Sequence, residues 1–98
     1  MSCGGASEVK TADDEIQKIC NDIRKELEKK ANTTFEEFTA KQYKSQVVAG
    51  TNYFVKIHIG NEKYVHVRIF KPLPHVSQDV ELSNHQLGKS AEEEIAYF

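Results

Sequence analysis

Apolar residues recur with a helical period in the first third of the chain. Between Ala12 or Asp13 and about Lys30 they are spaced three or four residues apart, which places them on one stripe of an α-helix. The stripe consists of Ile16, Ile19, Cys20, Ile23 and Leu27. Thr11 or Asp13 can cap the start, because their side-chain oxygens accept hydrogen bonds from the first helical N–H groups. The pattern predicts one amphipathic helix with a single buried face.

The rest of the chain alternates between apolar and polar positions, which is the period of a β-strand. Strand-like runs cover residues 38–45 and 51–59, a third follows residues 60–63, and a last one spans about 79–87. Residues 95–98 are mostly apolar and are expected to dock on the sheet. One helix followed by four antiparallel strands predicts an α+β fold, with the sheet wrapped across the helix stripe.

The two central runs predict a strand register, because their apolar side chains must share one face. We expect Ile59 to face Val65 and Ile57 to face Val67. A two-residue turn would break this parity. The sequence therefore predicts an odd-length loop, with three residues at 61–63 and a bulge.

The four histidines give no sign of a catalytic or metal centre. In the expected register His58 lies opposite His66, but the other ligands of a closed metal site are missing, so an exposed polar face is the better interpretation. His85 has no evident partner. No histidine lies at motif spacing from a cysteine or from a Ser/Asp pair. The sequence therefore predicts no enzyme activity and no cofactor.

The connection between the first two strand runs carries more apolar residues than a surface loop usually does. It places Val47, Val48 and Ala49 between Gln46 and Gly50. Gly50 permits a positive φ for a tight turn. An apolar tip is costly to leave in water, which favours a contact surface. The alternative is that Val47 and Val48 continue the strand and are buried inside the domain.

A later connection contains two prolines. Pro72 and Pro74 end β pairing and restrict the backbone, which predicts a stiff turn at residues 72–75 with Leu73 displayed. The alternative is a plain linking turn in which Leu73 folds back onto the core.

The N-terminal residues and the two cysteines bear on where the protein resides. Residues 1–11 have small side chains and no periodicity, which indicates a flexible arm with Cys3 exposed on it. Cys20 lies on the apolar stripe and is expected to be buried and inert. Two cysteines cannot form a disulfide framework, and the chain begins with no apolar run, so we expect no signal peptide and a cytoplasmic location.

Length and charge exclude several classes of partner. Ninety-eight residues are enough for one domain, and the 13 basic and 15 acidic residues give a net charge near −2. Nucleic acid and anionic membranes need clustered positive charge, so neither is expected as the main partner. No stretch approaches the about 18 apolar residues that a membrane span requires.

The apolar connection carries a resemblance to a known family. Residues 46–50 read Gln-Val-Val-Ala-Gly, which resembles the hairpin signature of the cystatins, inhibitors of papain-like cysteine proteases. The likeness extends to Tyr43-Lys44-Ser45, Thr51-Asn52-Tyr53-Phe54, Leu73-Pro74-His75 and Ala96-Tyr97-Phe98. Together these segments resemble a stefin, the small single-domain cytosolic branch, and more nearly the B-type than the A-type. The resemblance covers nearly all 98 residues.

The resemblance implies a cystatin-like fold, in which a short strand can precede the helix, and a wedge of three segments that occludes a protease cleft. It implies reversible, tight-binding competitive inhibition of papain-like cysteine proteases such as the cathepsins. The implied contact residues are Gly4, Gln46, Val47, Val48, Ala49, Gly50, Leu73, Pro74 and His75. Gly5 adds a second flexible point beside Gly4. The competing hypothesis is an interaction module, in which the hairpin opens and strands swap between two copies of a normally monomeric chain.

Overall fold

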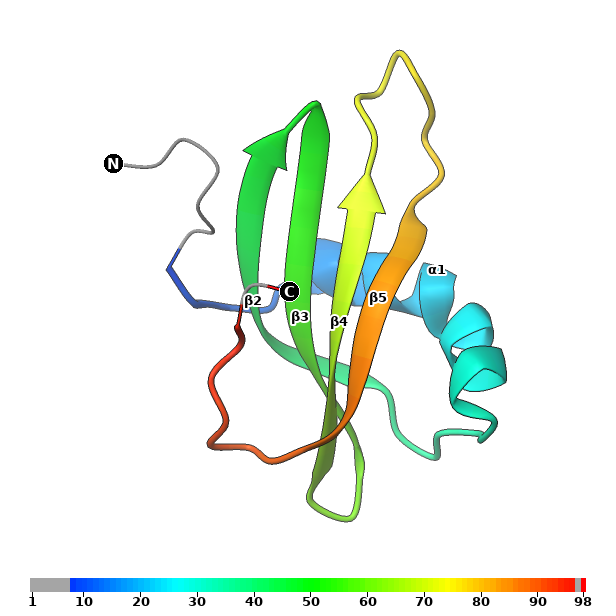
Figure 1. The fold of residues 1–98 in the computed structure, drawn as a ribbon, viewed down its shortest axis with the longest axis vertical. Helices are drawn as coiled ribbons and strands as arrows, with labels where there is room; N and C mark the ends of the chain where they lie inside the picture. The colour runs from blue at the N-terminus through cyan, green and yellow to red at the C-terminus, as the bar shows by residue number, and fades with distance from the viewer. Residues whose placement is uncertain (1–7, 97) are drawn as a thin grey trace.

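A computed structural model of the chain describes residues 8–96 and 98. Within these residues a single helix lies across a five-stranded antiparallel sheet (Figure 1). The elements in chain order are β1 Lys10–Thr11, α1 Asp14–Ala31, β2 Thr39–Val48, β3 Gly50–Gly60, β4 Lys63–Lys71 and β5 Glu81–Lys89. The spatial order of the strands follows the chain, from β1 to β5. The predicted α+β class is confirmed, and the strand before the helix that the resemblance allowed is present.

The helix begins and ends where its capping residues dictate. Asp13 is the N-cap, and its carboxylate accepts a hydrogen bond from the Ile16 backbone N–H at 3.0 Å. At the other end Asn32 takes a left-handed conformation with φ of 56°, which stops the helix after Ala31. The apolar stripe is buried as the helical period predicts; its members are Ile16, Ile19, Cys20, Ile23 and Leu27.

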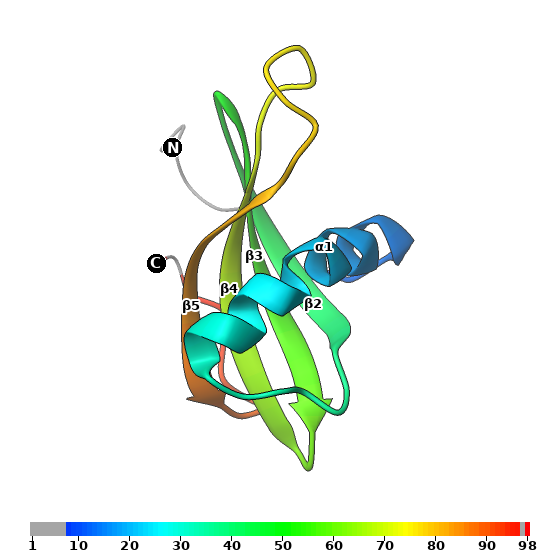
Figure 2. The same cartoon turned by 90° about the vertical axis from the view of Figure 1, so that its right-hand side faces the viewer.

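One face of the sheet packs on this stripe and forms the core. Figure 2 shows α1 lying against one side of the strands. The strand residues that face the helix are fully buried: Val55, Ile57, Val65, Val67 and Ile69. The predicted alternation along β3 and β4 is therefore confirmed.

The predicted register between β3 and β4 is wrong by two residues. Ile57 faces Val65, and the strands are joined by a two-residue turn, Asn61 and Glu62, with φ of 52° and 58°. Two successive left-handed residues make the type I′ turn that matches strand twist. The extra residue that preserves parity is Ile59, which bulges within β3. The bulge thus lies in the strand and not in the loop.

The other face of the sheet is covered by the C-terminal segment, residues 90–96 and 98, which we call the strap. Within the strap the Ile95 side chain is buried, and the Phe98 ring packs edge-on against Phe54 with centroids 5.9 Å apart. The Arg68 guanidinium also donates to the Phe98 carbonyl at 2.7 Å. The predicted docking of the apolar C-terminal residues is confirmed for those that the structure describes.

Two expectations about the histidines are corrected. His66 is paired with Lys56, and His58 with Tyr64, so the two imidazoles do not face each other. His66 is also 1% exposed, where an exposed polar face was expected, and through its pairing with Lys56 it lies on the face of the sheet where the strap lies. Lys56 lies beside it and donates from Nζ to the Ala91 carbonyl of the strap at 2.7 Å.

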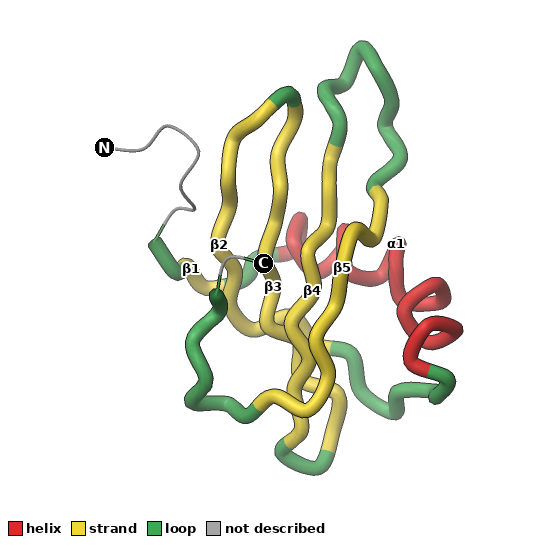
Figure 3. Tube along the Cα trace, viewed as in Figure 1, coloured by secondary structure: helices red, strands yellow, loops and turns green. Residues whose placement is uncertain are grey.

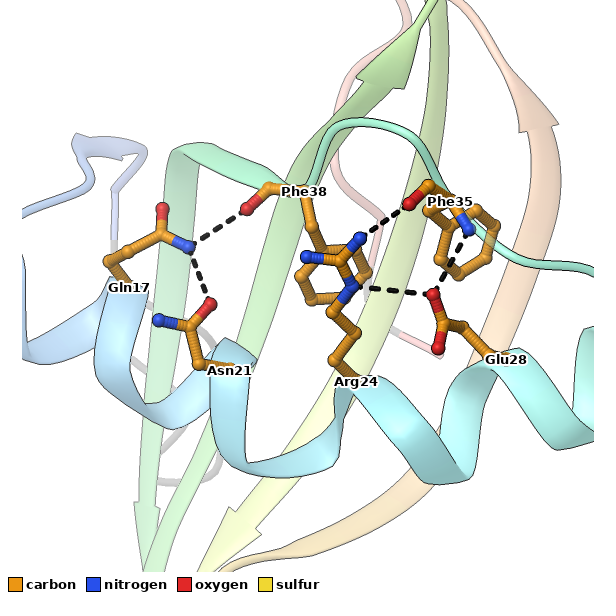
Figure 4. Close-up of polar contacts among 6 residues, drawn as sticks. All are labelled: Gln17, Asn21, Arg24, Glu28, Phe35 and Phe38. Atoms are coloured by element: carbon orange, nitrogen blue, oxygen red, sulfur yellow. Dashed lines mark hydrogen bonds and ion pairs between the residues drawn. The ribbon is translucent and has the colours of Figure 1, made fainter.

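The polar side of the helix holds the segment that leads into β2, as Figure 4 shows. Gln17 donates to the Phe38 carbonyl at 2.9 Å, and Arg24 donates to the Phe35 carbonyl. Glu28 accepts from the Phe35 backbone N–H at 3.0 Å and pairs with Arg24 at 3.3 Å. These bonds satisfy backbone groups that no strand pairs. They fix the start of β2, the strand that continues to the first hairpin.

Candidate functional site

Two connections lie side by side at one end of the sheet. The β2–β3 hairpin and the β4–β5 connection both project from the upper end in Figure 3, opposite the Asn61–Glu62 turn. Thr51, just after the hairpin tip, pairs with Lys71, the last residue of β4. The pairing sets the two connections next to each other on rigid strands. We call this end of the molecule the loop edge.

At the loop edge, β2 and β3 continue further than the sequence predicted. Val47 pairs with Thr51 and Val48 with Gly50, so only Ala49 lies between the two strands. The expectation that residues 46–50 form the connection is therefore corrected, because the connection is Ala49 alone. The valines continue the strand, as the alternative held, but they are not buried: Val47 is 75% exposed and Val48 44% exposed. The apolar tip is therefore displayed to solvent.

Gln46 holds the hairpin from inside. It is buried, unlike the valines that follow it, and its side-chain carbonyl accepts a hydrogen bond from the Asn52 amide at 3.0 Å. These two residues are also directly paired across β2 and β3. A cross-strand bond at this point stabilises the base of the exposed tip. The tip is thus a preformed structure.

Gly50 is required by two separate features of its position. Its φ of +121° lies in the region that favours glycine. A Cβ built on it would lie 2.6 Å from the Lys71 carbonyl oxygen and 2.9 Å from Cζ of Phe70. Both neighbours belong to the end of β4. Glycine thus lets the hairpin approach the strand that carries the second connection.

We expect Gly50→Ala to destabilise the protein by about 2 kcal/mol more than Gly60→Ala in urea unfolding. Gly60 is a matched control, because its φ is +102° but its Cβ would meet no heavy atom closer than 4.0 Å. Both variants carry the backbone strain, and only Gly50→Ala carries the clash. Equal losses of free energy in the two variants would mean that the close approach to β4 is unimportant.

The second connection displays two apolar side chains, one of which was not predicted from the sequence. The Leu73 carbonyl accepts from the Val76 N–H at 2.9 Å and from the Ser77 N–H at 3.2 Å, which closes a turn containing Pro74 and His75. Leu73 is 39% exposed, which excludes the alternative of folding back onto the core. Val76 is 68% exposed. Its only sequence signal was a valine directly after a predicted turn.

The loop edge has the geometry of a contact surface. It presents apolar side chains on two connections that are held by strand pairing and by hydrogen bonds within each connection. Such a surface can enter a hydrophobic cleft with little loss of conformational freedom. The sequence matches the Cystatin domain family over residues 4–92. The chain belongs to the cystatin family.

Individual relatives support the same assignment. This cystatin is 48% identical over 98 residues to Cystatin-B from Macaca fuscata fuscata and 47% identical over 98 residues to Cystatin-B from Homo sapiens. In both cases the similarity covers 100% of each chain. It is 45% identical over 98 residues to Cystatin-A1 from Sus scrofa, across 100% of this chain and 95% of the relative. The predicted resemblance to a stefin, nearest the B-type, is confirmed.

Family membership settles the general function of the chain. Cystatins inhibit cysteine proteases and are not enzymes, so the predicted class of activity is confirmed. The chemistry of the described residues is consistent with this. Burial raises the pKa of the Cys20 thiol to about 12, so that cysteine is protonated at neutral pH and unreactive, as predicted.

The described residues also bear on metal binding and on membrane spans. In residues 8–96 and 98, no three His, Cys, Asp or Glu side chains lie close enough together to hold a metal ion. Over the same described stretch of the chain, no helix has both the length and the apolar character needed to cross a bilayer.

The N-terminal arm of this cystatin is described only from Glu8 onward. Gly4, Gly5 and Cys3 lie outside the described residues, so the predicted contact at Gly4 stays a prediction. The last two residues of the predicted arm, Lys10–Thr11, form β1 and pair with β2. This pairing anchors the arm to the same strand that carries Val47 and Val48.

Proposed function

We propose that this cystatin inhibits papain-like cysteine proteases, the cathepsins among them, reversibly and competitively, by inserting its loop edge into the active-site cleft. The observation that supports the proposal is the exposure of Val47 and Val48 at a tip that the rest of the structure holds rigid. We propose as contact residues Gly4, Gln46, Val47, Val48, Ala49, Gly50, Leu73, Pro74 and His75.

In this proposal each segment has its own task. Val47 and Val48 supply apolar area that is buried in the cleft, at about 25 cal/mol for each Å² removed from water. Gln46 keeps the hairpin in its binding conformation through Asn52, and Gly50 keeps it against β4. Leu73 extends the apolar contact from the second connection. Since both connections are preformed, an interface of roughly 1,600 Å² can reach high affinity.

The same geometry explains why such an inhibitor is not cleaved. At the tip, the backbone of Val47 and Val48 is engaged in the antiparallel pairing of β2 with β3. The cleft therefore receives side chains and a closed turn, and no extended peptide lies in line with the protease nucleophile. Binding blocks substrate by occupying its place, which is competitive inhibition, and dissociation returns both proteins intact.

We further propose that the active form is a cytoplasmic monomer. A free, buried thiol at Cys20 fits a reducing compartment. Both strands of the β2–β3 hairpin pair within one chain, so a single copy displays the loop edge. A strand-swapped dimer that opened this hairpin would remove the tip, and we expect it to be inactive.

The test is a titration of active papain with the gel-filtered monomer, followed with a small fluorogenic peptide. We expect activity to fall linearly to zero at one inhibitor per active enzyme, to return on dilution, and the recovered inhibitor to have its original mass. Full papain activity in the presence of excess folded monomer would refute the proposal. Inhibition that substrate cannot relieve would refute the competitive mechanism.

A further inference from the structure

The exposed apolar side chains of this protein are unevenly distributed. Among the described residues, six large hydrophobic side chains are exposed, and four of them belong to the loop edge. These four are Val47, Val48, Leu73 and Val76. Three lie in the two motifs that the resemblance to the cystatins assigns to the protease contact. Val76 lies outside both motifs, and at 68% its exposure exceeds that of Val48 and Leu73.

The structure holds Val76 in place from both sides. Its backbone N–H donates to the Leu73 carbonyl at 2.9 Å, and the next residue donates to the same carbonyl at 3.2 Å. Pro74 lies between these bonded groups and restricts the backbone further. Ser77 in turn accepts from the Asp79 N–H through its hydroxyl at 3.1 Å. A valine has a single side-chain torsion, so the Val76 side chain loses little freedom when it is buried in a complex.

The position of Val76 on the molecule differs from that of the other three. Residues 72–80 form the connection from β4 to β5, and Figures 1 and 2 both show this connection reaching beyond the β2–β3 tip along the long axis. Val76 is part of the turn in this connection and closes it with its backbone N–H. It can therefore meet a region of a bound protein that the hairpin valines do not reach.

We propose that Val76 is a further contact of this inhibitor, and that it determines how strongly different papain-like proteases are bound. The proposal rests on the function proposed above. In the complex, Val76 contacts the rim of the protease cleft on the side of the second connection. The surface that carries Val76 is continuous with the contact surface of Leu73, which is bonded to it directly.

The chemistry of the contact predicts discrimination between proteases. A protease with an apolar rim at this place buries the Val76 side chain and gains from its removal from water. A protease with a charged or polar rim there must desolvate that group against a valine and gains nothing. Differences of this size change affinity mainly through the dissociation rate. Val76 would thus give different affinities for proteases that bind the hairpin equally well.

The experiment compares Val76→Ser, Val76→Leu and Leu87→Ser with the unaltered protein, against papain and two cathepsins. Leu87 is the matched control, because it is 47% exposed on β5 and lies outside the loop edge. We expect Val76→Ser to raise the inhibition constant about tenfold for at least one protease, through faster dissociation, and by a clearly different factor for another. Val76→Leu and Leu87→Ser should stay within about threefold.

Each other outcome overturns a stated element of the inference. An unchanged inhibition constant for Val76→Ser with all three proteases, while the unaltered protein inhibits them, refutes the contact and leaves the proposed function standing. An equal loss against all three proteases refutes the discriminating role. A lack of inhibition by the unaltered protein refutes both proposals together. Unfolding midpoints within about 1 °C would show that the surface substitutions leave the fold unchanged.

Discussion

Val48→Asp is expected to raise the inhibition constant for papain by at least about a hundredfold without unfolding the protein. In the free protein Val48 is 44% exposed, so a carboxylate there can remain solvated. In the proposed complex the same carboxylate would be removed from water in an apolar cleft, where an unpaired charge costs several kcal/mol. A hundredfold loss of affinity corresponds to about 2.7 kcal/mol. The inhibition constant and the urea midpoint are measured on the same preparation.

Leu87→Asp is the matched control for this charge. Leu87 has nearly the same exposure, 47%, but lies on β5, away from the hairpin. We expect it to inhibit papain within about twofold of the unaltered protein, because surface substitutions usually have small effects. If Val48→Asp and Leu87→Asp inhibited equally well, the hairpin tip would not enter the cleft.

The helix and the core face of the sheet could be predicted because their patterns are redundant. Five apolar residues mark the stripe of α1, and one misplaced residue would not have hidden the period. Along β3 and β4 the alternation assigns each residue to one of two faces. The assignment of residues to faces was correct although the predicted register was wrong, because Ile57 and Val65 share a face in both the predicted and the observed pairing.

The register could not be predicted because a bulge leaves little trace in sequence. The two-residue turn at Asn61 and Glu62 breaks parity, and the bulge at Ile59 restores it. A three-residue loop without the bulge would place the same side chains on the core face, but it would give every residue of β3 a different partner on β4. Only geometry distinguishes the two, since β-branched Ile59 carries none of the glycine signal that marks some bulges.

The candidate site was predicted partly by pattern and partly by resemblance. The apolar tip itself drew attention to Val47 and Val48, but their exposure depends on how far β2 and β3 extend, which the pattern left open. Val76 was missed because a single valine after a turn has no periodic signal. The bonds from Arg24 and Glu28 to Phe35 were also missed, since charged residues on a helix usually indicate a solvated face.

The burial of His66 shows a different limit of alternation. Its position on the polar face of β4 was correctly predicted, but a polar face is exposed only if nothing covers it. Here the strap supplies Ile95 and Phe98, which are distant in sequence from the strands that they cover. Both nitrogens of the His66 ring lack a hydrogen-bond partner among the described residues. The fold therefore contains a buried imidazole that is best kept neutral.

The surroundings of His66 disfavour its charged form. Burial is the largest cause, and the nearby Lys56 and Lys89 act in the same direction. Glu93, on the strap, acts in the opposite direction but is itself paired with Lys89 at 3.4 Å. Together these groups lower the pKa of His66 from 6.5 to about 4. The proton is thus taken up more readily by the unfolded chain than by the folded protein.

This difference in pKa predicts a loss of stability in weak acid. Well above pH 6.5 the imidazole is neutral in both states, and the full stability is present. As the pH falls from 6.5 to about 4, only the unfolded chain gains the proton, so the free energy of unfolding decreases by up to about 1.4 kcal/mol per pH unit. The total decrease in the free energy of unfolding that is due to His66 approaches roughly 3 kcal/mol near pH 4. Below it both states are protonated and the contribution stops changing.

Urea unfolding at pH 7.0, 6.0 and 5.0 isolates this effect from that of the carboxylates. Hydrogen bonds lower the pKa of Glu28, Glu37 and Glu93 from 4.5, so the stability they confer is lost mainly at still lower pH. We expect His66→Leu to flatten the decline between pH 7 and 5. His85→Leu, which removes one imidazole from β5 and leaves His66 in place, should keep it. An unaltered slope in His66→Leu would place the acid sensitivity elsewhere, because the buried ring would then be titrating equally in the folded and unfolded states.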